Sequence, residues 1–131
     1  MVKNKVLFSV KIPALPPSVN SAVRYGRGIF YDNAKKKEFK ALAIPLLREA
    51  YKAAEPYKGK CALSISLFDS TSRRWDIDNR VKVIQDCLGV AHDGAGVIAD
   101  DKQIYRLLVQ RFKSSKAEGP YTLVTIFEID E

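Results

Sequence analysis

The chain has 131 residues, of which 47% are hydrophobic and 28% are charged. This length fits a single domain over residues 1–131, and this composition supports a buried core without disulfides or structural metals. The apolar runs are far shorter than the roughly 18 residues of a membrane span, and the N-terminus lacks an apolar signal segment. We therefore expect a cytoplasmic protein with no membrane partner. The two cysteines form no spaced pattern, which excludes a zinc finger and a disulfide-rich secreted domain.

The charges are unevenly distributed along the chain. The formal net charge is +7, and residues 1–60 contain 13 basic and 4 acidic side chains, whereas residues 61–131 contain 9 and 11. A basic half is typical of proteins that bind a polyanion such as nucleic acid, and many other proteins also have a basic surface. Charge alone leaves both interpretations open.

The N-terminal third predicts a strand followed by a long loop. Residues 6–12 alternate in hydropathy, which predicts a strand with one buried face formed by Val6, Phe8, Val10 and Ile12. Prolines then end the strand, and residues 18–31 are expected to form a loop.

Helical spacing follows the loop. Apolar residues over 39–51 recur at intervals of three and four, and Asp32 or Asn33 precedes them as a candidate N-cap. Pro45 lies inside this pattern, so we expect a kink or a break near residues 43–44.

The central part predicts a second strand and a second helix. Residues 61–68 alternate, with Leu63, Ile65 and Leu67 inward. A polar loop leads to a helix over 79–88, with Asp78 as the N-cap and Gly89 as the stop. The apolar face of this helix is expected to consist of Val81, Ile84 and Leu88.

The C-terminal part predicts two more strands. A glycine-containing connector over 90–99 precedes strands at 104–112 and 121–129, which we expect to pair as a hairpin. The predicted order is β-α-β-α-β-β. This order indicates an α+β domain with a mixed four-stranded sheet packed against two helices.

The acidic residues of the second half are biased toward one type. Seven aspartates and no glutamate lie between residues 69 and 101: Asp69, Asp76, Asp78, Asp86, Asp93, Asp100 and Asp101. Glutamate is the better helix former, whereas aspartate caps helices and binds hard cations. The bias therefore favours a role in chemistry over a solvated helix face.

Two pairs of aspartates stand out. Asp76 and Asp78, two apart in extended backbone, are expected to face the same way. On the following helix, Lys82 and Asp86 continue the stripe at intervals of four residues. Such a lysine is placed to neutralise a phosphate.

Asp100 and Asp101 form the second pair, and a bound cation would relieve their mutual repulsion. Carboxylates without histidine or cysteine indicate magnesium or manganese. Taken singly, Asp78 could be a helix cap, Asp86 an exposed partner of Lys82, and the Asp100–Asp101 pair a turn.

The spaced residues resemble one family. The segment WDIDN at residues 75–79 with Lys82 and Asp86, then Asp100, Asp101, Gln103 and Ile104, is similar to the signatures D-[LIV]-D-N-x-x-K-x-x-x-D and D-D-x-Q-[IV] of RusA-type Holliday junction resolvases. The segment PPSVN at residues 16–20 resembles the P-P-S-x-N element of that family. The connector before Asp100 is a few residues longer than expected.

The resemblance implies a homodimeric, magnesium-dependent endonuclease of phage or prophage type that nicks four-way DNA junctions symmetrically. Its catalytic and metal-binding aspartates fall on Asp76, Asp78 and Asp101. Asp100 falls on an auxiliary acid, and Lys82 on the functional lysine.

Basic residues near these motifs are expected to bind DNA. Arg73 and Arg74 directly precede the first acidic pair and are placed to contact phosphates, although an exposed loop would also carry such residues. The wider set consists of Asn20, Arg24, Arg27, Lys35, Lys36 and Lys37.

Two rival hypotheses remain. Phosphohydrolases of small phosphate esters also use Asp-x-Asp, but directly after a strand of a doubly wound fold, and here a polar loop intervenes. A basic α+β module that binds DNA or RNA without cutting would explain the charge, but not the Asp100–Asp101 pair.

Overall fold

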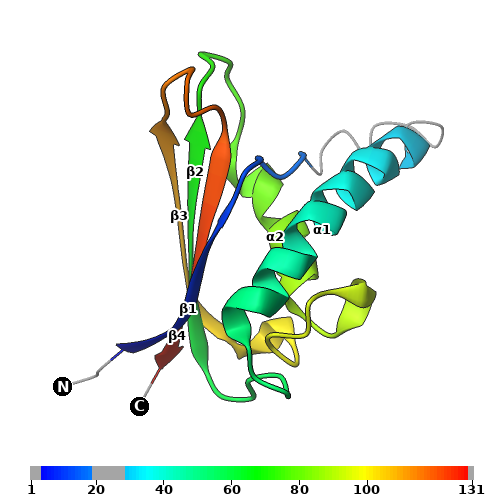
Figure 1. Ribbon diagram of the computed structural model, residues 1–131, viewed down its shortest axis with the longest axis vertical. Helices are drawn as coiled ribbons and strands as arrows, with labels where there is room; N and C mark the ends of the chain where they lie inside the picture. Colours follow the sequence, from blue (N-terminus) through cyan, green and yellow to red (C-terminus); the bar gives the residue numbers. More distant parts are fainter. Residues whose placement is uncertain (1–3, 19–28, 130–131) are drawn as a thin grey trace.

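The computed structural model describes residues 4–18 and 29–129. The elements follow the predicted order: β1 (Asn4–Ile12), α1 (Ile29–Tyr51), β2 (Cys61–Asp69), α2 (Val81–Leu88), β3 (Ile104–Lys113) and β4 (Tyr121–Ile129). Figure 1 shows both helices on one side of a four-stranded sheet. The α+β class and the mixed sheet are therefore confirmed.

The strand order is β1-β4-β2-β3. The expected hairpin between the last two strands is wrong, because β4 lies between β1 and β2 and is antiparallel to both. β3 instead pairs in parallel with β2, and α2 belongs to the crossover between them. Two parallel neighbouring strands need such a crossover connection. After β3, the chain instead turns back and forms β4, which is not a neighbour of β3 in the sheet.

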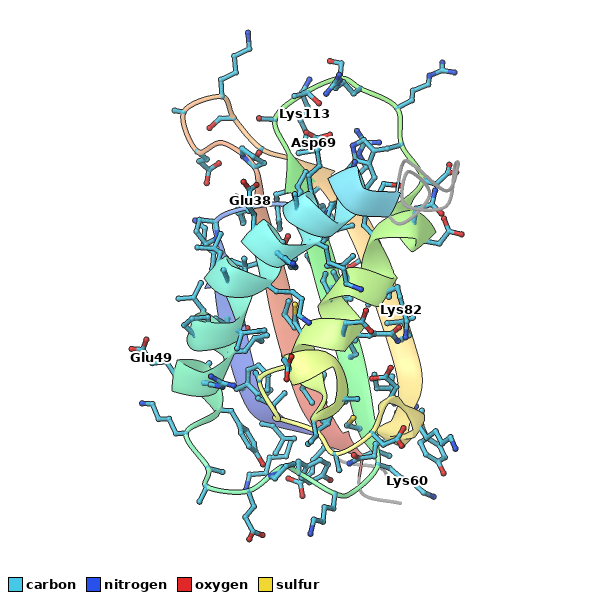
Figure 2. All side chains as sticks on the ribbon, turned by 90° about the vertical axis from the view of Figure 1, so that its right-hand side faces the viewer. Glu38, Glu49, Lys60, Asp69, Lys82 and Lys113 are labelled. Carbon is cyan, nitrogen blue, oxygen red and sulfur yellow. The ribbon has the colours of Figure 1, made fainter. Side chains whose placement is uncertain are left out.

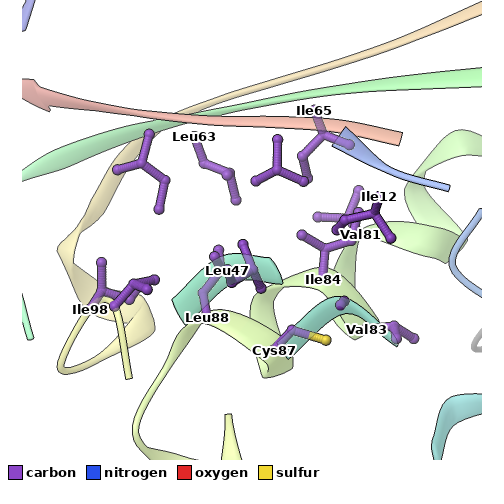
Figure 3. Packing of buried hydrophobic residues seen from close by; sticks show 14 of the residues in the cluster. Ile12, Leu47, Leu63, Ile65, Val81, Val83, Ile84, Cys87, Leu88 and Ile98 are labelled. Carbon is purple, nitrogen blue, oxygen red and sulfur yellow. The ribbon is translucent and has the colours of Figure 1, made fainter. Parts of the chain in front are cut away.

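The core lies between the helices and one face of the sheet. Figure 3 shows Leu63 and Ile65 of β2 facing Leu47 of α1 and Ile84 and Leu88 of α2. β2 alternates strictly between buried and half-buried residues, as its sequence pattern predicts. The predicted apolar face of the second helix is likewise buried.

Both cysteines behave as small core hydrophobes. Cys61 and Cys87 are fully buried and unpaired. Burial raises the pKa of each thiol to about 11, which keeps it protonated and unreactive at neutral pH.

The prediction for the first strand needs one correction. Phe8 and Ile12 are buried as expected, but Val6 is exposed. The pairing of β1 with β4 shifts between Val6 and Phe8, so Leu7 is an extra residue that interrupts the alternation.

Of the kink or break expected near residues 43–44, the break does not occur. α1 runs through Pro45 as one helix from Ile29 to Tyr51 and begins before the predicted caps. Proline in a helix interior costs about 3 kcal/mol. The burial of Ala43 and Leu47 on either side offsets this cost by holding both halves against the sheet.

The connector between α2 and β3 is anchored to the core. Val97 and Ile98 are buried, and the backbone of Tyr57 exchanges hydrogen bonds with Val97 and Ala99. Gly94 passes so close to the end of α2 that a Cβ there would overlap the carbonyl oxygens of Asp86 and Gly89. The anchored connector thereby determines the position of Asp100 and Asp101, which follow it in the chain.

Candidate functional site

Asp86 lies at the centre of an ion-pair network that joins both helices. Its side chain is only 3% exposed, and the Lys36 ammonium of α1 donates a hydrogen bond to its Oδ2 at 2.8 Å. The Lys82 ammonium lies 3.4 Å from Oδ1, one helical turn away. Asp86 is therefore not the exposed helix residue of the simpler interpretation, but a buried acid paired with two lysines.

Lys82 also reaches the second acidic pair. Its Nζ lies 3.6 Å from Oδ2 of Asp101, and its side chain is 55% exposed. Figure 2 shows Lys82 on α2 near β3. The structure thus confirms the Lys82–Asp86 contact and adds one to Asp101.

These contacts shift the protonation equilibria. The charge of Asp86, and to a smaller extent that of Asp101, raises the pKa of Lys82 despite partial burial. Burial alone would raise the pKa of Asp86, but the hydrogen bond and charge of Lys36, together with Lys82, lower it. Lys82 and Asp86 are therefore both charged at neutral pH.

The first acidic pair lies at the start of a 3-10 turn. Asp76 is extended, but residues Ile77–Arg80 form the turn, and α2 begins only at Val81. Asp78 is therefore neither part of an extended run nor the helix N-cap, which corrects both predictions. Asp76 makes one long contact, a hydrogen bond of 3.4 Å from Asn79, and both carboxylates are exposed.

The second pair begins another 3-10 turn. Asp100 forms a capping box: its Oδ1 accepts from the Lys102 amide at 2.9 Å, and its own amide donates to Gln103 Oε1 at 2.7 Å. The Gln103 amide group donates to the carbonyls of Tyr57 and Gly59 at 2.7 and 2.9 Å. The interpretation as a turn is thus correct for Asp100, whereas Asp101 faces Lys82.

Two neighbouring hollows connect the acids. One of about 480 Å³ is bounded by Asp78, Lys82 and Gln85 of the α2 region and by Leu107 and Val109 of β3. A smaller one of about 110 Å³ shares Gln85 and is bounded by Asp86, Asp100 and Asp101. Four of the acids (Asp78, Asp86, Asp100 and Asp101) and Lys82 therefore lie along one side of α2, whereas Asp76 borders neither hollow.

The acids near Lys82 have the chemistry of ligands for a divalent cation. Among residues 4–18 and 29–129, no three metal-ligating side chains form a ready cluster. The donors are carboxylates on the two sides of Lys82, which are the ligands of hard cations. Magnesium keeps several water ligands and shares its coordination with substrate phosphates, so separated carboxylates suit it without a closed cage.

A second buried acid supports the loop that carries the first pair. Asp69 at the end of β2 is 4% exposed and accepts hydrogen bonds from Thr71, from Trp75 Nε1 at 2.7 Å and from Arg111 at 3.0 Å. Burial alone would raise its pKa, but bonds from Thr71 and Trp75 and the charge of Arg111 lower it. Figure 2 shows Asp69 at the end of β2, beside Lys113.

Two arginine side chains stack over the ring of Trp75. The guanidinium groups of Arg80 and Arg111 lie 4.3 and 4.1 Å from its ring centroid. Arg80 also donates to the carbonyl of Pro16 at 2.7 Å, which ties the PPSVN segment to the turn of Asp78. Trp75 packs against the core beside the site.

The predicted DNA-binding residues have different surroundings. Arg73, Arg74, Lys35 and Lys37 are exposed, whereas Lys36 is engaged by Asp86. The expectations for Asn20, Arg24 and Arg27 lie outside the described residues.

Sequence reasoning did not assign roles to Asp69 or Arg111, and it assigned Lys36 to DNA rather than to Asp86. The sequence did indicate that Asp69 is buried. It follows Leu63, Ile65 and Leu67 at the same two-residue interval, so its side chain points to the same inner face of β2. No local pattern revealed its pairing with Arg111, which depends on the β2–β3 neighbourhood.

The comparison with protein families covers most of the chain. The family model described as Endodeoxyribonuclease RusA matches residues 13–126, which include both acidic pairs, Lys82 and Asp86. No curated protein matches the chain closely enough to count as a relative. No helix within the described residues is long and apolar enough to cross a membrane.

Proposed function

The chain belongs to the RusA endodeoxyribonuclease family, and from that premise we propose that it is a magnesium-dependent nuclease that resolves four-way DNA junctions by paired symmetric nicks. We place its role in recombination and repair in the cytoplasm of a bacterial or phage-infected cell. The observation that carries the proposal is the placement of exposed carboxylates on both sides of Lys82, along one side of α2.

We assign the metal to Asp76, Asp78 and Asp101, with Asp100 as an auxiliary acid. Nucleases of this family depend in general on a divalent metal. Magnesium, or manganese in its place, would lower the pKa of a bound water and polarise the phosphodiester. Because Asp76 and Asp78 are exposed, they can change rotamer to approach an ion without unpacking the core.

Lys82 has the charge-stabilising role in this proposal. Its ammonium remains protonated at neutral pH, because Asp86 and Asp101 raise its pKa. More than half of its side chain is exposed, so it can contact a phosphoryl oxygen of the scissile group. Asp86 cannot itself reach that oxygen, because it is buried beneath both lysines.

DNA is held by the basic residues around the site. Arg73 and Arg74 precede Asp76 in an exposed loop, and Lys35 and Lys37 extend the positive surface along α1. These side chains supply phosphate contacts that position the duplex arms. We assign the same role to Asn20, Arg24 and Arg27.

A homodimer completes the proposal. A four-way junction presents two equivalent strands to cut, and a chain of 131 residues carries one acidic set. Two copies related by a two-fold axis provide two sites in matching orientation.

The test is cleavage of a labelled synthetic junction, with a linear duplex of the same sequence as the control. We expect paired nicks in the junction with Mg²⁺, none with EDTA, and little cutting of the duplex. Equal cleavage in EDTA would contradict the metal assignment. Junction binding without cleavage under any divalent metal would favour the non-enzymatic binding module.

A further inference from the structure

Gln103 connects the second acidic pair to a segment that is distant in the sequence. Its half-buried side chain reaches the backbone before β2, where Nε2 donates to the carbonyl oxygens of Tyr57 at 2.7 Å and Gly59 at 2.9 Å. Its Oε1 accepts from the Asp100 amide at 2.7 Å. The amide group thus uses both of its N–H donors and its oxygen. Gln103 lies beside the acids, yet it has no part in the proposed chemistry.

The segment that receives Gln103 is itself well anchored. β2 and β3 are parallel, so the residues before each strand lie at the same end of the sheet (Figure 1). The Tyr57 hydroxyl donates to the Lys60 carbonyl at 3.2 Å, and its ring closes over Gly59, where a Cβ would overlap the hydroxyl oxygen. The Lys60 carbonyl also accepts from the Ile129 amide at 3.0 Å, which ties the segment to the end of β4.

Asp101 lies inside the turn that Gln103 holds. The 3-10 turn contains only Asp101–Gln103, and β3 begins at the next residue. Because Gln103 Oε1 binds the amide of Asp100 just before the turn, one side chain fixes both of its ends. The turn directs the Asp101 carboxylate toward α2. Its Oδ2 lies 3.6 Å from Lys82 Nζ, and a Cβ on Gly89 would lie 3.8 Å from its Oδ1.

The first acidic pair is held less firmly. Asp76 and Asp78 are exposed, and Asp76 accepts one long hydrogen bond of 3.4 Å from Asn79. Ordering mobile side chains around a ligand costs entropy, so an ion binds more tightly when one of its ligands is already in place. Of the assigned metal ligands, Asp101 is the one whose backbone is fixed by a dedicated side chain.

We propose that Gln103 is a positioning residue of the metal site, which fixes Asp101 as the pre-placed ligand to which Asp76 and Asp78 adapt. The proposal rests on the proposed function, because it takes its metal ligands from there. Gln103 acts only through the backbone of the turn, since its amide group is used by backbone partners. Contacts that orient metal ligands typically contribute 10- to 100-fold to metal affinity.

Mn²⁺ binding to the full chain without DNA tests the proposal. The ion replaces Mg²⁺ as a probe because it takes the same oxygen ligands, and electron paramagnetic resonance measures the free ion. Gln103→Met keeps an unbranched side chain of similar length but removes the three hydrogen bonds. It should weaken Mn²⁺ binding by about 10- to 100-fold.

Ser114→Ala is the matched control. The Ser114 hydroxyl also donates to a backbone carbonyl, that of Gly119 at 2.8 Å, but at the opposite end of β3. This variant should bind Mn²⁺ like the wild type. Urea unfolding reports the stability of both variants. A purely structural role for Gln103 would lower its unfolding midpoint and leave the Mn²⁺ affinity of the folded chain unchanged.

A double-mutant cycle shows whether Gln103 acts through Asp101. Asp101→Asn removes the charge of the ligand, so adding Gln103→Met to it should cause no further loss of Mn²⁺ affinity. Gln103→Asn retains the amide but is one methylene shorter, so it cannot span the same partners. It carries the same test if circular dichroism shows that Gln103→Met is unfolded.

Junction cleavage provides a separate readout. Gln103→Met should raise the Mg²⁺ concentration for half-maximal rate by about 10- to 100-fold. The rate at saturating Mg²⁺ and the KM for the junction should stay near their wild-type values, because Gln103 contacts neither the ion nor DNA.

The outcomes separate this proposal from the proposed function. Weaker Mn²⁺ binding that disappears in the Asp101→Asn background supports the positioning role, even if the wild type cuts no junction and the proposed function fails. Wild-type affinity in Gln103→Met, or an equal added loss in the Asp101→Asn background, would overturn the role even if junctions are cut. A wild type that binds no Mn²⁺ would overturn it as well.

Discussion

The aspartates between residues 69 and 101 divide into two groups that look identical in the sequence. Asp69 and Asp86 are buried, and each binds at least one cationic side chain. Asp76, Asp78 and Asp100 are exposed, and Asp101 contacts the partly exposed Lys82. The difference teaches that the buried acids hold the scaffold, while the exposed acids remain accessible to a ligand.

Each buried acid supports one part of the candidate site. Asp69 fixes Trp75 and Arg111, and so it holds the loop that leads to Asp76. Asp86 fixes Lys36 and Lys82, and so it joins α1 to α2. Removing a buried acid should therefore lower stability, whereas removing an exposed acid should lower activity.

The largest expected effect is on catalysis. Asp78→Asn keeps the shape of the side chain but removes the charge assigned to the metal, so junction cleavage should fall by roughly three orders of magnitude. Stability should change by less than about 0.5 kcal/mol, because the residue is exposed. Asp93→Asn, another exposed aspartate of the same stretch, is the control and should cut normally. Cleavage by Asp78→Asn at the wild-type rate would remove Asp78 from the site.

The next effect is on stability. Asp69→Asn weakens the bonds to Thr71 and Trp75 and leaves Arg111 without its carboxylate, so the free energy of unfolding should fall by about 2–3 kcal/mol. Urea unfolding measures this loss, and Trp75 fluorescence should shift because its Nε1 partner changes. Asp76→Asn should cost less than about 0.5 kcal/mol. Equal losses for both variants would break the distinction between the two groups.

The pH dependence of stability should follow from the buried group. The contacts of Asp69 and Asp86 lower the pKa of both acids in the folded state, so their contribution is complete above the unfolded value of about 3.9. It is lost as the pH falls below that value toward the folded pKa values. Each acid adds up to about 1.4 kcal/mol per pH unit there. Asp86→Asn should reduce this slope in urea titrations at pH 2 to 5, and an unchanged slope would contradict the role of Asp86.

The smallest effect separates the lysines of α1. Lys35→Ala and Lys37→Ala should each lower the slope of log binding constant against log salt by about 0.9, if each side chain contacts one phosphate. Lys36→Ala should mainly reduce stability, because its ammonium binds Asp86. Fluorescence anisotropy with a labelled junction measures the slopes. Identical slopes for all three variants would mean that pairing with Asp86 does not distinguish Lys36.

Local patterns in the sequence determined much of the fold. The strict alternation of β2 predicted its buried face, and the spacing of Val81, Ile84 and Leu88 predicted the inner side of α2. These predictions succeed because a strand or a short helix buries one face whatever its neighbours are. The Lys82–Asp86 contact was predictable for the same reason, since it lies within one helical turn.

Only the tertiary structure decided which strands are neighbours and which acids are buried. No local pattern shows that β4 enters between β1 and β2, because sheet order depends on contacts between distant segments. The Lys36–Asp86 and Asp69–Arg111 pairs likewise join residues 50 and 42 positions apart. The sequence by itself determined that acids and a lysine cluster near one helix. Burial against distant elements then divided these acids into a structural group and a group that remains open to a ligand.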